Sequence, residues 1–519
     1  MRILGINLGH DGHICLLKDG QLSFSRESEK DSGKRYANLS PSFVLKNFLS
    51  ALDGLDAIAI SGWAEGNDPR SHPVDGGYLG FNVTTERIDV GDRELYWLTC
   101  SHEYSHIAST YALSPFSDVE SCYVLLWEGF IGRFYLIEPD MKVNFLGEVM
   151  ESPGLRYGFA YGLADPTFNL PRGYSRLGDA GKMMALAAYG EAGPLSDAEA
   201  EVVDYIMNCE SALDILYKPD LRDSAFHNIG VQSKAFCNLS RKLTDLIFDK
   251  FFRFAQGKVD RALPLLISGG CGLNCEWNKK WSKSGLFSSV FVSPCTNDSG
   301  VGIGAAAIAQ KLLTEKLSLD WSVYSGDSFI EDIEWTPEEA DVSPLDYRQV
   351  SEALLRGEIV CWVQGNCEIG PRALGNRSIL AAPFSEVMTK KINSIKQREP
   401  FRPIAPVCLQ EDASLHFDRC TESKYMLDFY NVLDCRLRAI THVDGTARVQ
   451  TVTSGDNPPL YELLKEFKRI SGVGVLCNTS LNFKGKGFIN RMSQLKEFST
   501  FTGISILVVN DKMYKRTPV

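Results

Sequence analysis

Short apolar runs separated by tight turns open the chain. Residues 2–9, 13–18 and 21–27 are rich in Ile, Leu and Phe, and Asp19-Gly20 separates the last two runs. An Asp-Gly pair between two apolar runs is a strong β-hairpin signal. The pattern therefore predicts two or three short strands joined by turns.

The same style of sequence returns twice along the chain. Residues 119–138 predict a strand, a turn at Gly129 and Gly132, and a second strand, whereas 263–274 predict a strand, a Gly-Gly turn and a helix start. This layout suggests an α/β fold with two related halves facing each other across a nucleotide cleft, as in actin-like ATPases. The spacing alone leaves other α/β arrangements open.

Helical periodicity fills the intervals between these strands. Ser101 is a candidate N-cap for a helix over 102–113. The segment 233–256 is amphipathic with Gly257 as its stop, and 299–313 is a Gly/Ala-rich helix that must pack closely against a neighbour.

A change in composition and hydrophobic pattern predicts the domain boundary. Residues 315–348 are acidic and irregular, and a helix over 351–358 and a strand over 359–365 follow them. We place the boundary near residue 325, which gives expected domains of 1–325 and 326–519. A length of 519 residues is ample for two or more domains with a large core.

Composition excludes several classes of protein. With 44% hydrophobic and 23% charged residues, the chain matches soluble globular proteins and neither disordered nor fibrous ones. The net charge of −11 argues against nucleic acid or an anionic membrane as the main partner, because both require a basic surface. A local cluster of cations for an anionic small molecule remains compatible with this charge.

The chain also lacks the signals of export and of membrane insertion. No stretch approaches the roughly 18 consecutive apolar residues of a transmembrane helix, and the N-terminus has no signal-peptide pattern. The 14 cysteines show no C-x-x-C spacing, which is typical of buried thiols in a reducing compartment. We therefore expect a soluble, cytoplasmic protein.

A pair of histidines is the first candidate for chemistry. His102 and His106 stand four residues apart on a predicted helix, so both imidazoles share one face and can bind one metal ion. Glu128 and Asp298 are candidate carboxylates to complete the set, which would suit a divalent metal such as iron. The alternative is a pair of partly buried polar histidines without a metal.

Glycines and a lysine suggest an anion site in the first domain. Gly269 and Gly270 follow an apolar strand and precede a helix start, where the backbone can approach a ligand closely. Lys182 follows a Gly-rich turn and could meet a phosphate. A simple tight turn and a solvated lysine are the alternatives.

The second half of the chain concentrates cations near glycines and prolines. Guanidinium groups bind phosphate oxygens bidentately and lysine adds a point charge, so this concentration predicts a site for several phosphates. Separate surface ion pairs are the alternative. The residues concerned are Arg372, Arg377, Lys396, Arg398, Arg402 and Arg448, with the polar cluster Asn478-Thr479-Ser480.

These motifs resemble a known family, the O-carbamoyltransferases of antibiotic and nodulation-factor biosynthesis, which includes the tobramycin and cephem carbamoyltransferases. The resemblance spans essentially the whole chain, and the length and early GHDG are similar to the branch that carbamoylates the hydroxymethyl group of cephems. It rests on GHDGHICLLKDG, SHEYSHIAST, SGGCGLNCEWN, EIGPRALGNRSILA, REPFRPIAP and CNTSLNFKGKG.

The resemblance implies two reactions in two domains. A C-terminal α/β domain of YrdC type would join carbamoyl phosphate and ATP to give carbamoyl adenylate and pyrophosphate. An N-terminal actin-like (ASKHA) domain would pass the carbamoyl group to an alcohol and release AMP. ATP and carbamoyl phosphate would be co-substrates, accompanied by Mg²⁺ and by Fe(II) or another divalent metal.

The resemblance also assigns roles to residues. The carbamoyl phosphate and ATP site would comprise Arg372, Arg377, Lys396, Arg402, Arg448, Asn478 and Ser480. The adenylate would lie near Lys182, Gly269, Gly270 and Asn274, and His102, His106 and Asp298 would hold the metal. The family has an Asp in a D-G turn where this chain has Glu128, so the fourth metal ligand is left open.

The transfer step needs a base for the acceptor hydroxyl. His10, with Asp11 beside it, lies at the first strand–turn and can serve, although a structural turn histidine is the alternative. The acceptor is expected to be a small hydroxylated molecule whose identity the sequence does not reveal, and the oligomeric state, a homodimer included, is left open.

Two other functions stay open on the sequence. One is a threonylcarbamoyl transferase acting on transfer RNA, against which the net charge of −11 counts. The other is a non-catalytic ATP-binding switch, in which the histidine pair and the second anion site would have no purpose.

Overall fold

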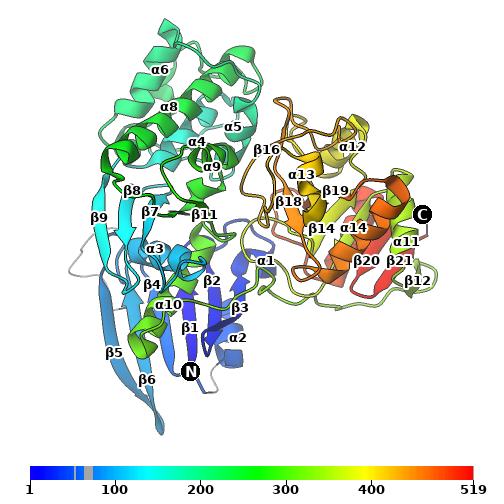
Figure 1. Cartoon of the computed structure of the whole chain (residues 1–519), viewed down its shortest axis with the longest axis horizontal. Helices are drawn as coiled ribbons and strands as arrows, with labels where there is room; N and C mark the ends of the chain where they lie inside the picture. The colour runs from blue at the N-terminus through cyan, green and yellow to red at the C-terminus, as the bar shows by residue number, and fades with distance from the viewer. Residues whose placement is uncertain (52–53, 64–73, 518–519) are drawn as a thin grey trace. The chain divides into compact units, whose positions relative to one another are not determined.

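The computed structural model describes residues 1–51, 54–63 and 74–517, which form a mixed α/β protein (Figure 1). Its chain divides into two compact units. The first consists of Met1–Ser117, Ser293–Thr441 and Thr446–Val519, and the second of Asp118–Val292 and His442–Gly445. The first unit contains two large sheets and the second contains one.

The N-terminal sheet of the first unit has the order β3-β2-β1-β4-β6-β5. Its strands β1, β2 and β3 are antiparallel, as the hairpin signal predicts, and Asp19 and Gly20 have φ of 50° and 84°. β4 and β6 then add in parallel, with β5 antiparallel at the edge. The bounds are β1(Arg2–Asn7), β2(His13–Lys18), β3(Gln21–Glu27), β4(Ala57–Ser61), β5(Val83–Val90) and β6(Arg93–Cys100).

Helices cover both faces of this sheet because successive residues of β1 point to opposite sides. Leu4 and Ile6 pack with Phe43 of α2(Pro41–Ala51). On the other face Gly5 meets α10(Val301–Thr314), where a Cβ would lie 2.2 Å from the Gly302 carbonyl oxygen. The short α1(Ser28–Ser32) follows β3 directly.

Close packing between α10 and α3(His102–Ala112) depends on glycine, as the Gly/Ala-rich sequence predicts. A Cβ at Gly304 would lie 1.9 Å from the Ser105 carbonyl oxygen of α3, which no rotamer change can relieve. The two helices carry or immediately follow residues of the candidate metal set, so this packing also positions the site.

We expect Gly304→Ala to destabilise the protein by about 3 kcal/mol, because two helix backbones must separate. The measurement is thermal or denaturant unfolding followed by circular dichroism. Gly257→Ala is the matched control, since its Cβ meets nothing within 4 Å in a helix, and a stabilisation of about 0.5 kcal/mol is expected. Equal stability of the two variants would contradict the packing argument.

The C-terminal sheet of the first unit has eight strands in the order β12-β21-β20-β13-β14-β19-β15-β18. Helices α11 and α14 pack on one face with Leu354 and Leu463, and α12 and α15 on the other with Ile392 and Leu495. The strands are β12(Ala340–Pro344), β13(Val360–Val363), β14(Arg377–Ala381), β15(Ala405–Leu409), β18(Gln450–Val452), β19(Val475–Ser480), β20(Ile506–Val509) and β21(Lys512–Arg516), with β16(Tyr430–Asn431) and β17(Thr446–Ala447) apart; the helices are α11(Tyr347–Leu355), α12(Glu386–Ile395), α13(Ala413–His416), α14(Pro458–Ser471) and α15(Met492–Thr502).

The second unit repeats the pattern of the N-terminal sheet. Its order is β11-β10-β7-β8-β9, in which β7, β8 and β9 are antiparallel and β10 and β11 add in parallel. The same sequence of directions in both sheets is what two related halves require. The elements are β7(Cys122–Trp127), β8(Gly132–Ile137), β9(Val143–Glu148), β10(Leu265–Ser268), β11(Val290–Val292), α4(Pro153–Ala164), α5(Asp179–Ala187), α6(Asp197–Asn208), α7(Ala212–Ile215), α8(Lys234–Lys258) and α9(Cys275–Ser282).

Local predictions agree closely with these elements, with small differences at the ends. Ser101 is the N-cap of α3 and accepts from the Tyr104 N–H at 3.4 Å. Gly257 does not stop α8, which continues to Lys258. The predicted boundary near residue 325 lies between α10 and β12, and the division into 1–325 and 326–519 stays a prediction.

All 14 cysteines are free thiols, as their spacing predicts, and most are buried. Among the residues that the structure describes, no helix is long and apolar enough to cross a membrane.

Candidate functional site

Two imidazoles meet on the buried face of α3. His102 and His106, one helical turn apart, are 0% and 1% exposed, and their Nε2 atoms lie 3.2 Å from each other. The N-cap at Ser101 starts the helix at His102, which fixes the direction of both side chains. Two buried ring nitrogens at this separation are a normal arrangement for binding one ion between them.

A carboxylate completes the cluster in this unit. Asp298 starts the 3₁₀ turn Asp298–Gly300 that leads into α10, and its oxygens lie 3.4 Å from His106 Nε2 and 3.8 Å from His102 Nε2. Burial would raise the pKa of this carboxyl, but the charges of the three histidines around it outweigh burial and lower the pKa. Asp298 therefore carries a negative charge toward the ring nitrogens.

The donor set fits a divalent metal ion. One ligand atom each of His102, His106 and Asp298 lies within 4.8 Å of the others, and all three residues are buried. Two imidazoles and one carboxylate with further positions open are ligands that iron and similar metals accept. The sequence gave no sign of the aromatic residues that surround these ligands. The Tyr78 ring stacks on the His102 ring with 4.6 Å between centroids, and the Trp63 ring meets the His102 ring edge-on at 5.7 Å.

His10 and Asp11 lie in the turn after β1, beside this cluster. His10 Nδ1 is 3.0 Å from Asp11 Oδ2, and His10 Nε2 is 3.5 Å from Asp298 Oδ2. The turn is held by Asn7, whose side-chain amide donates to the His10 carbonyl at 3.1 Å and to the Asp298 carbonyl at 3.2 Å. The His10 side chain is 33% exposed, so a ligand can reach it.

The Asp11 carboxylate orients the His10 ring. A hydrogen bond from Nδ1–H to Asp11 leaves Nε2 as the basic nitrogen, which is the arrangement of a general base with an orienting acid. Asp11 has a φ of 51°, a left-handed backbone that is uncommon for a residue other than glycine, and such strain often marks functional turns.

The predicted adenylate residues and Glu128 belong to the second unit. Gly269 has a φ of 93°, and a Cβ there would lie 2.5 Å from the Trp127 carbonyl oxygen and 2.8 Å from Glu128 Cβ, so glycine is required. Asn274 is the N-cap of α9 and accepts from the N–H of Glu276 at 3.1 Å. The structure thus gathers this Gly-Gly turn beside Glu128 at the end of β7.

Lys182 and Gly270 take different positions in that unit. Lys182 lies on α5, where its Nζ donates to Asp179 Oδ1 at 3.1 Å, so it has an ion-pair partner. Gly270 opens the 3₁₀ turn after β10 and has open space at its Cβ position. The roles of Glu128 as a fourth metal ligand and of Lys182 in adenylate binding stay predictions.

Lys396 is a buried cation at the end of α12. Its Nζ donates to the carbonyl oxygens of Ser480 at 2.5 Å and Asn482 at 2.8 Å, and it also contacts the Asn482 side-chain oxygen. Burial, and then the positive charges of Arg398 and Arg402, hold its pKa well below the usual range. Asn482, which the sequence analysis did not single out, is therefore a direct partner of the predicted lysine.

The arginines around Lys396 repel one another. Burial, followed by Arg402 and Arg448, lowers the pKa of Arg398 to about 9. Burial also lowers the pKa of Arg402; Glu399 opposes this, at 3.8 Å, while Arg448 adds to it. Arg398 and Arg402 thus disfavour the charge of Lys396, and Arg402 and Arg448 disfavour that of Arg398, so the cluster favours an anion carrying several charges.

Arg377 and Asn478 are buried in protein contacts. Arg377 is 0% exposed and donates to Asn490 Oδ1 at 2.7 Å and to the Gln364 carbonyl at 2.7 Å. Asn478 donates to Gln450 Oε1 at 2.9 Å. These contacts indicate that Arg377 orders the loop before β14, and its role in phosphate binding stays a prediction.

The loop that carries Arg372 is fixed by a buried carboxylate. Glu368 Oε1 accepts from the N–H groups of Leu374 and Asn376, both at 2.7 Å. Arg372 thereby lies on ordered backbone. Ser480 lies at the end of β19, where its hydroxyl donates to Asn482 Oδ1 at 2.7 Å. The sequence placed these residues in one site but gave no sign of the Glu368 support.

Comparison with known proteins matches both halves of the chain. The family models described as Carbamoyltransferase N-terminus and Carbamoyltransferase C-terminus match residues 82–307 and 351–516. The chain is 44% identical to 3'-hydroxymethylcephem-O-carbamoyltransferases of Amycolatopsis lactamdurans and Streptomyces clavuligerus, covering 99% of this chain and 99% of each relative. It is 32% identical to Nodulation protein U of Rhizobium fredii, over 94% of this chain and 90% of that protein.

One solved structure with partial similarity is that of Ta0583, an archaeal actin homolog, in complex with ADP. It covers 60% of this chain and 100% of its own, with 12% identity and a TM-score of 0.30. A TM-score this low does not establish a common fold.

Proposed function

The chain belongs to the carbamoyltransferase family, and we propose that it performs ATP-dependent O-carbamoylation in two half-reactions. The first forms carbamoyl adenylate from carbamoyl phosphate and ATP, and the second transfers the carbamoyl group to a hydroxyl. The observation that carries the proposal is the presence of two chemically different centres in one chain: a histidine–carboxylate cluster around Asp298 and a cation cluster around Lys396.

We assign the first half-reaction to residues 326–519, which we take to be a YrdC-like domain. Water releases inorganic phosphate from carbamoyl phosphate, and the resulting carbamate oxygen attacks the α-phosphorus of ATP, so that pyrophosphate leaves. Lys396, Arg402 and Arg448 would bind the phosphate oxygens and offset their repulsion. Mutual repulsion among these cations is relieved when a polyanion binds, which supports this role.

We assign the second half-reaction to residues 1–325, as an actin-like domain of two related halves. The acceptor hydroxyl attacks the carbamoyl carbon of the adenylate, the O–H proton passes to His10 Nε2, and AMP leaves. The Asp11 carboxylate, whose Oδ2 lies 3.0 Å from His10 Nδ1, orients the His10 ring and stabilises its protonated form. A carbamoyl adenylate hydrolyses readily, so burial of the site protects it.

A metal ion fits the cluster of His102, His106 and Asp298, and we propose Fe(II) or another divalent metal there. When bound, it would supply a Lewis acid for phosphate oxygens of the adenylate. The protein's own contribution is to hold two imidazoles and a carboxylate in place behind Tyr78.

Loss of metal is the expected effect of His106→Ala. The substitution removes one nitrogen of the pair at 3.2 Å, so the metal content after anaerobic loading with Fe(II) should fall at least tenfold. Elemental analysis measures the content, and His227→Ala, a histidine of the second unit bound to the Leu221 carbonyl, is the control. An unchanged metal content in His106→Ala would exclude the proposed ligand set.

The acceptor we propose is a 3'-hydroxymethylcephem, which the two 44% identical relatives are named for. The experiment supplies the protein with ATP, carbamoyl phosphate and this alcohol, and follows the carbamate ester by mass spectrometry. A carbamoylated cephem supports the proposal. Product formation with other alcohols but none with the cephem would overturn the acceptor and leave the reaction type standing.

Two alternative functions were left open by the sequence. Membership of an enzyme family excludes the non-catalytic ATP-binding switch. A threonylcarbamoyl transferase would need a surface for transfer RNA, and the net charge of −11 disfavours that substrate.

A further inference from the structure

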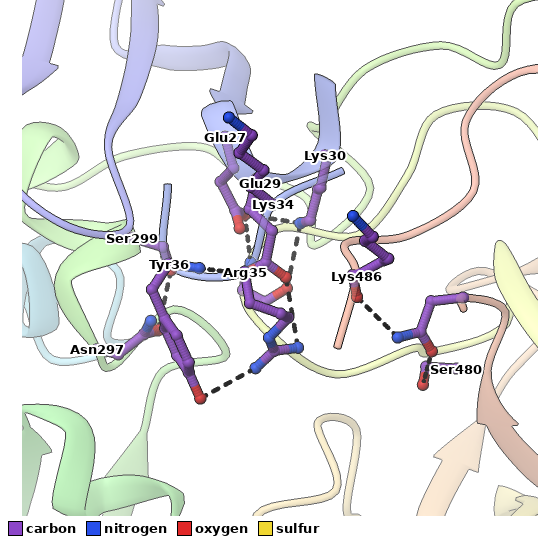
Figure 2. A network of polar contacts seen from close by, with 12 residues as sticks. Glu27, Glu29, Lys30, Lys34, Arg35, Tyr36, Asn297, Ser299, Ser480 and Lys486 are labelled. Atoms are coloured by element: carbon purple, nitrogen blue, oxygen red, sulfur yellow. Dashed lines mark hydrogen bonds and ion pairs between the residues drawn. The ribbon is translucent and has the colours of Figure 1, made fainter. Parts of the chain in front are cut away.

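An arginine that no motif singled out lies just after α1. Arg35 has its Nη1 atom 3.4 Å from Glu29 Oε1, and its Nη2 donates to the Tyr36 hydroxyl at 3.3 Å. The Tyr36 N–H donates to the other Glu29 oxygen at 2.9 Å, so one buried carboxylate holds both residues (Figure 2). The position of the guanidinium is therefore set by its surroundings.

The backbone at this point is strained. Tyr36 has a φ of 55°, in the left-handed region that a tyrosine rarely adopts. Strained residues persist where the surrounding contacts over-determine them, and they cluster at ligand sites. Here the strain places the Tyr36 ring against Arg35, whose Cζ lies 4.8 Å from the ring centroid.

The segment of Arg35 docks on the C-terminal part of the same unit. The Gly487 N–H donates to the Gly33 carbonyl at 3.2 Å, and a Cβ at Gly487 would lie 2.3 Å from the Glu29 carbonyl oxygen. Lys30 Nζ donates to the Gly370 carbonyl at 3.1 Å. These contacts join α1 to the loop that follows β19 and to the loop before β14.

The same loop leads back to Lys396. The Lys486 carbonyl accepts from Asn482 Nδ2 at 2.8 Å, and the Asn482 carbonyl accepts from Lys396 at 2.8 Å. The charge of Arg35 is close enough to be one of those that lower the pKa of Lys396 and of Arg402. Arg35, which comes from the N-terminal part of the chain, therefore lies within electrostatic range of the cation cluster.

We propose that Arg35 is a phosphate ligand of the Lys396–Arg402 anion site, delivered by the segment between β3 and α2. Its guanidinium group would bind two oxygens of a phosphate group, and Glu29 would hold that group in position. The inference rests on the proposed function and adds a residue that ties the two parts of the first unit to one ligand. The ligand class is a phosphate ester or anhydride, either ATP or carbamoyl phosphate.

Pyrophosphate binding by the full-length protein, measured by isothermal titration calorimetry, tests the proposal. Arg35→Gln is expected to raise the pyrophosphate Kd about 10-fold and to flatten its dependence on salt, because one charge contact is lost. Arg35→Lys keeps the positive charge but lacks the two-pronged guanidinium group. Its pyrophosphate Kd should therefore lie between that of Arg35→Gln and that of the unmodified protein. Arg87→Gln, at an arginine 70% exposed on β5, is the matched control and should leave the Kd unchanged.

The source of the phosphate follows from the KM values of Arg35→Lys in the pyrophosphate-release assay. A rise for ATP alone assigns Arg35 to the nucleotide, and a rise for carbamoyl phosphate alone assigns it to that substrate; both support the proposal. A Kd and both KM values within twofold of the unmodified protein in both Arg35 variants would overturn it. Arg402→Ala tests the anion site separately from the role of Arg35. An unchanged pyrophosphate Kd in that variant would refute the anion site itself.

Discussion

Lys396→Ala is expected to reduce pyrophosphate release from ATP and carbamoyl phosphate at least 10³-fold. The lysine is the buried cation of the cluster, bound to Ser480 and Asn482, and its removal leaves the phosphates without their central charge. Transfer from supplied carbamoyl adenylate should stay within threefold of normal, because His10 and Asp298 lie in a different part of the structure.

A lysine on the same helix provides the control. Lys390 of α12 is exposed, so Lys390→Ala tests whether any loss of a positive charge on this helix reduces the rate. It should leave both half-reactions unchanged. If Lys396→Ala lowers both half-reactions equally, the assignment of adenylate formation to this cluster is wrong.

The second large effect is expected from His10→Asn, with the opposite pattern. Asparagine keeps a hydrogen bond to Asp11 but has no basic nitrogen at the position of Nε2, so the acceptor proton has no recipient. Transfer from carbamoyl adenylate should fall about 10²- to 10⁴-fold, while pyrophosphate release stays near normal. The rates of both half-reactions are measured separately with the same protein sample.

Chemical rescue distinguishes a base from a structural turn residue. The His10 side chain is 33% exposed, so imidazole can enter the space left in His10→Ala. Added imidazole should restore part of the transfer rate in that variant and leave Lys396→Ala unaffected. A His10→Asn protein that transfers at the normal rate would show that the histidine only shapes the turn.

Sequence predicted the local structure well because its signals are local. Asp19-Gly20 fixes a hairpin, Ser101 caps a helix, and the glycines of α10 require a close neighbour, which the structure identifies as α3. The order of the strands within each sheet could not be predicted, since strands such as β13 and β20 pair across more than a hundred residues. No short-range pattern encodes which distant strand becomes the neighbour.

The candidate site divides in the same way. The spacing of His102 and His106 on one helix predicted their meeting, and Asp298 joins them from a distant turn. The cluster of second-half cations was found by composition, but the burial of Arg377 was not, because a charged residue gives no local sign of the acceptors that will surround it. Arg35 was missed for a related reason: its role depends on contacts made across the fold.

The most direct test of the account is pyrophosphate release without any acceptor, from ATP and carbamoyl phosphate with Mg²⁺ and Fe(II) present. We predict release that requires carbamoyl phosphate, with AMP appearing only as the adenylate hydrolyses or when an alcohol is added. Conversion of ATP to ADP and inorganic phosphate, independent of carbamoyl phosphate, would contradict adenylate formation as the chemistry of this protein.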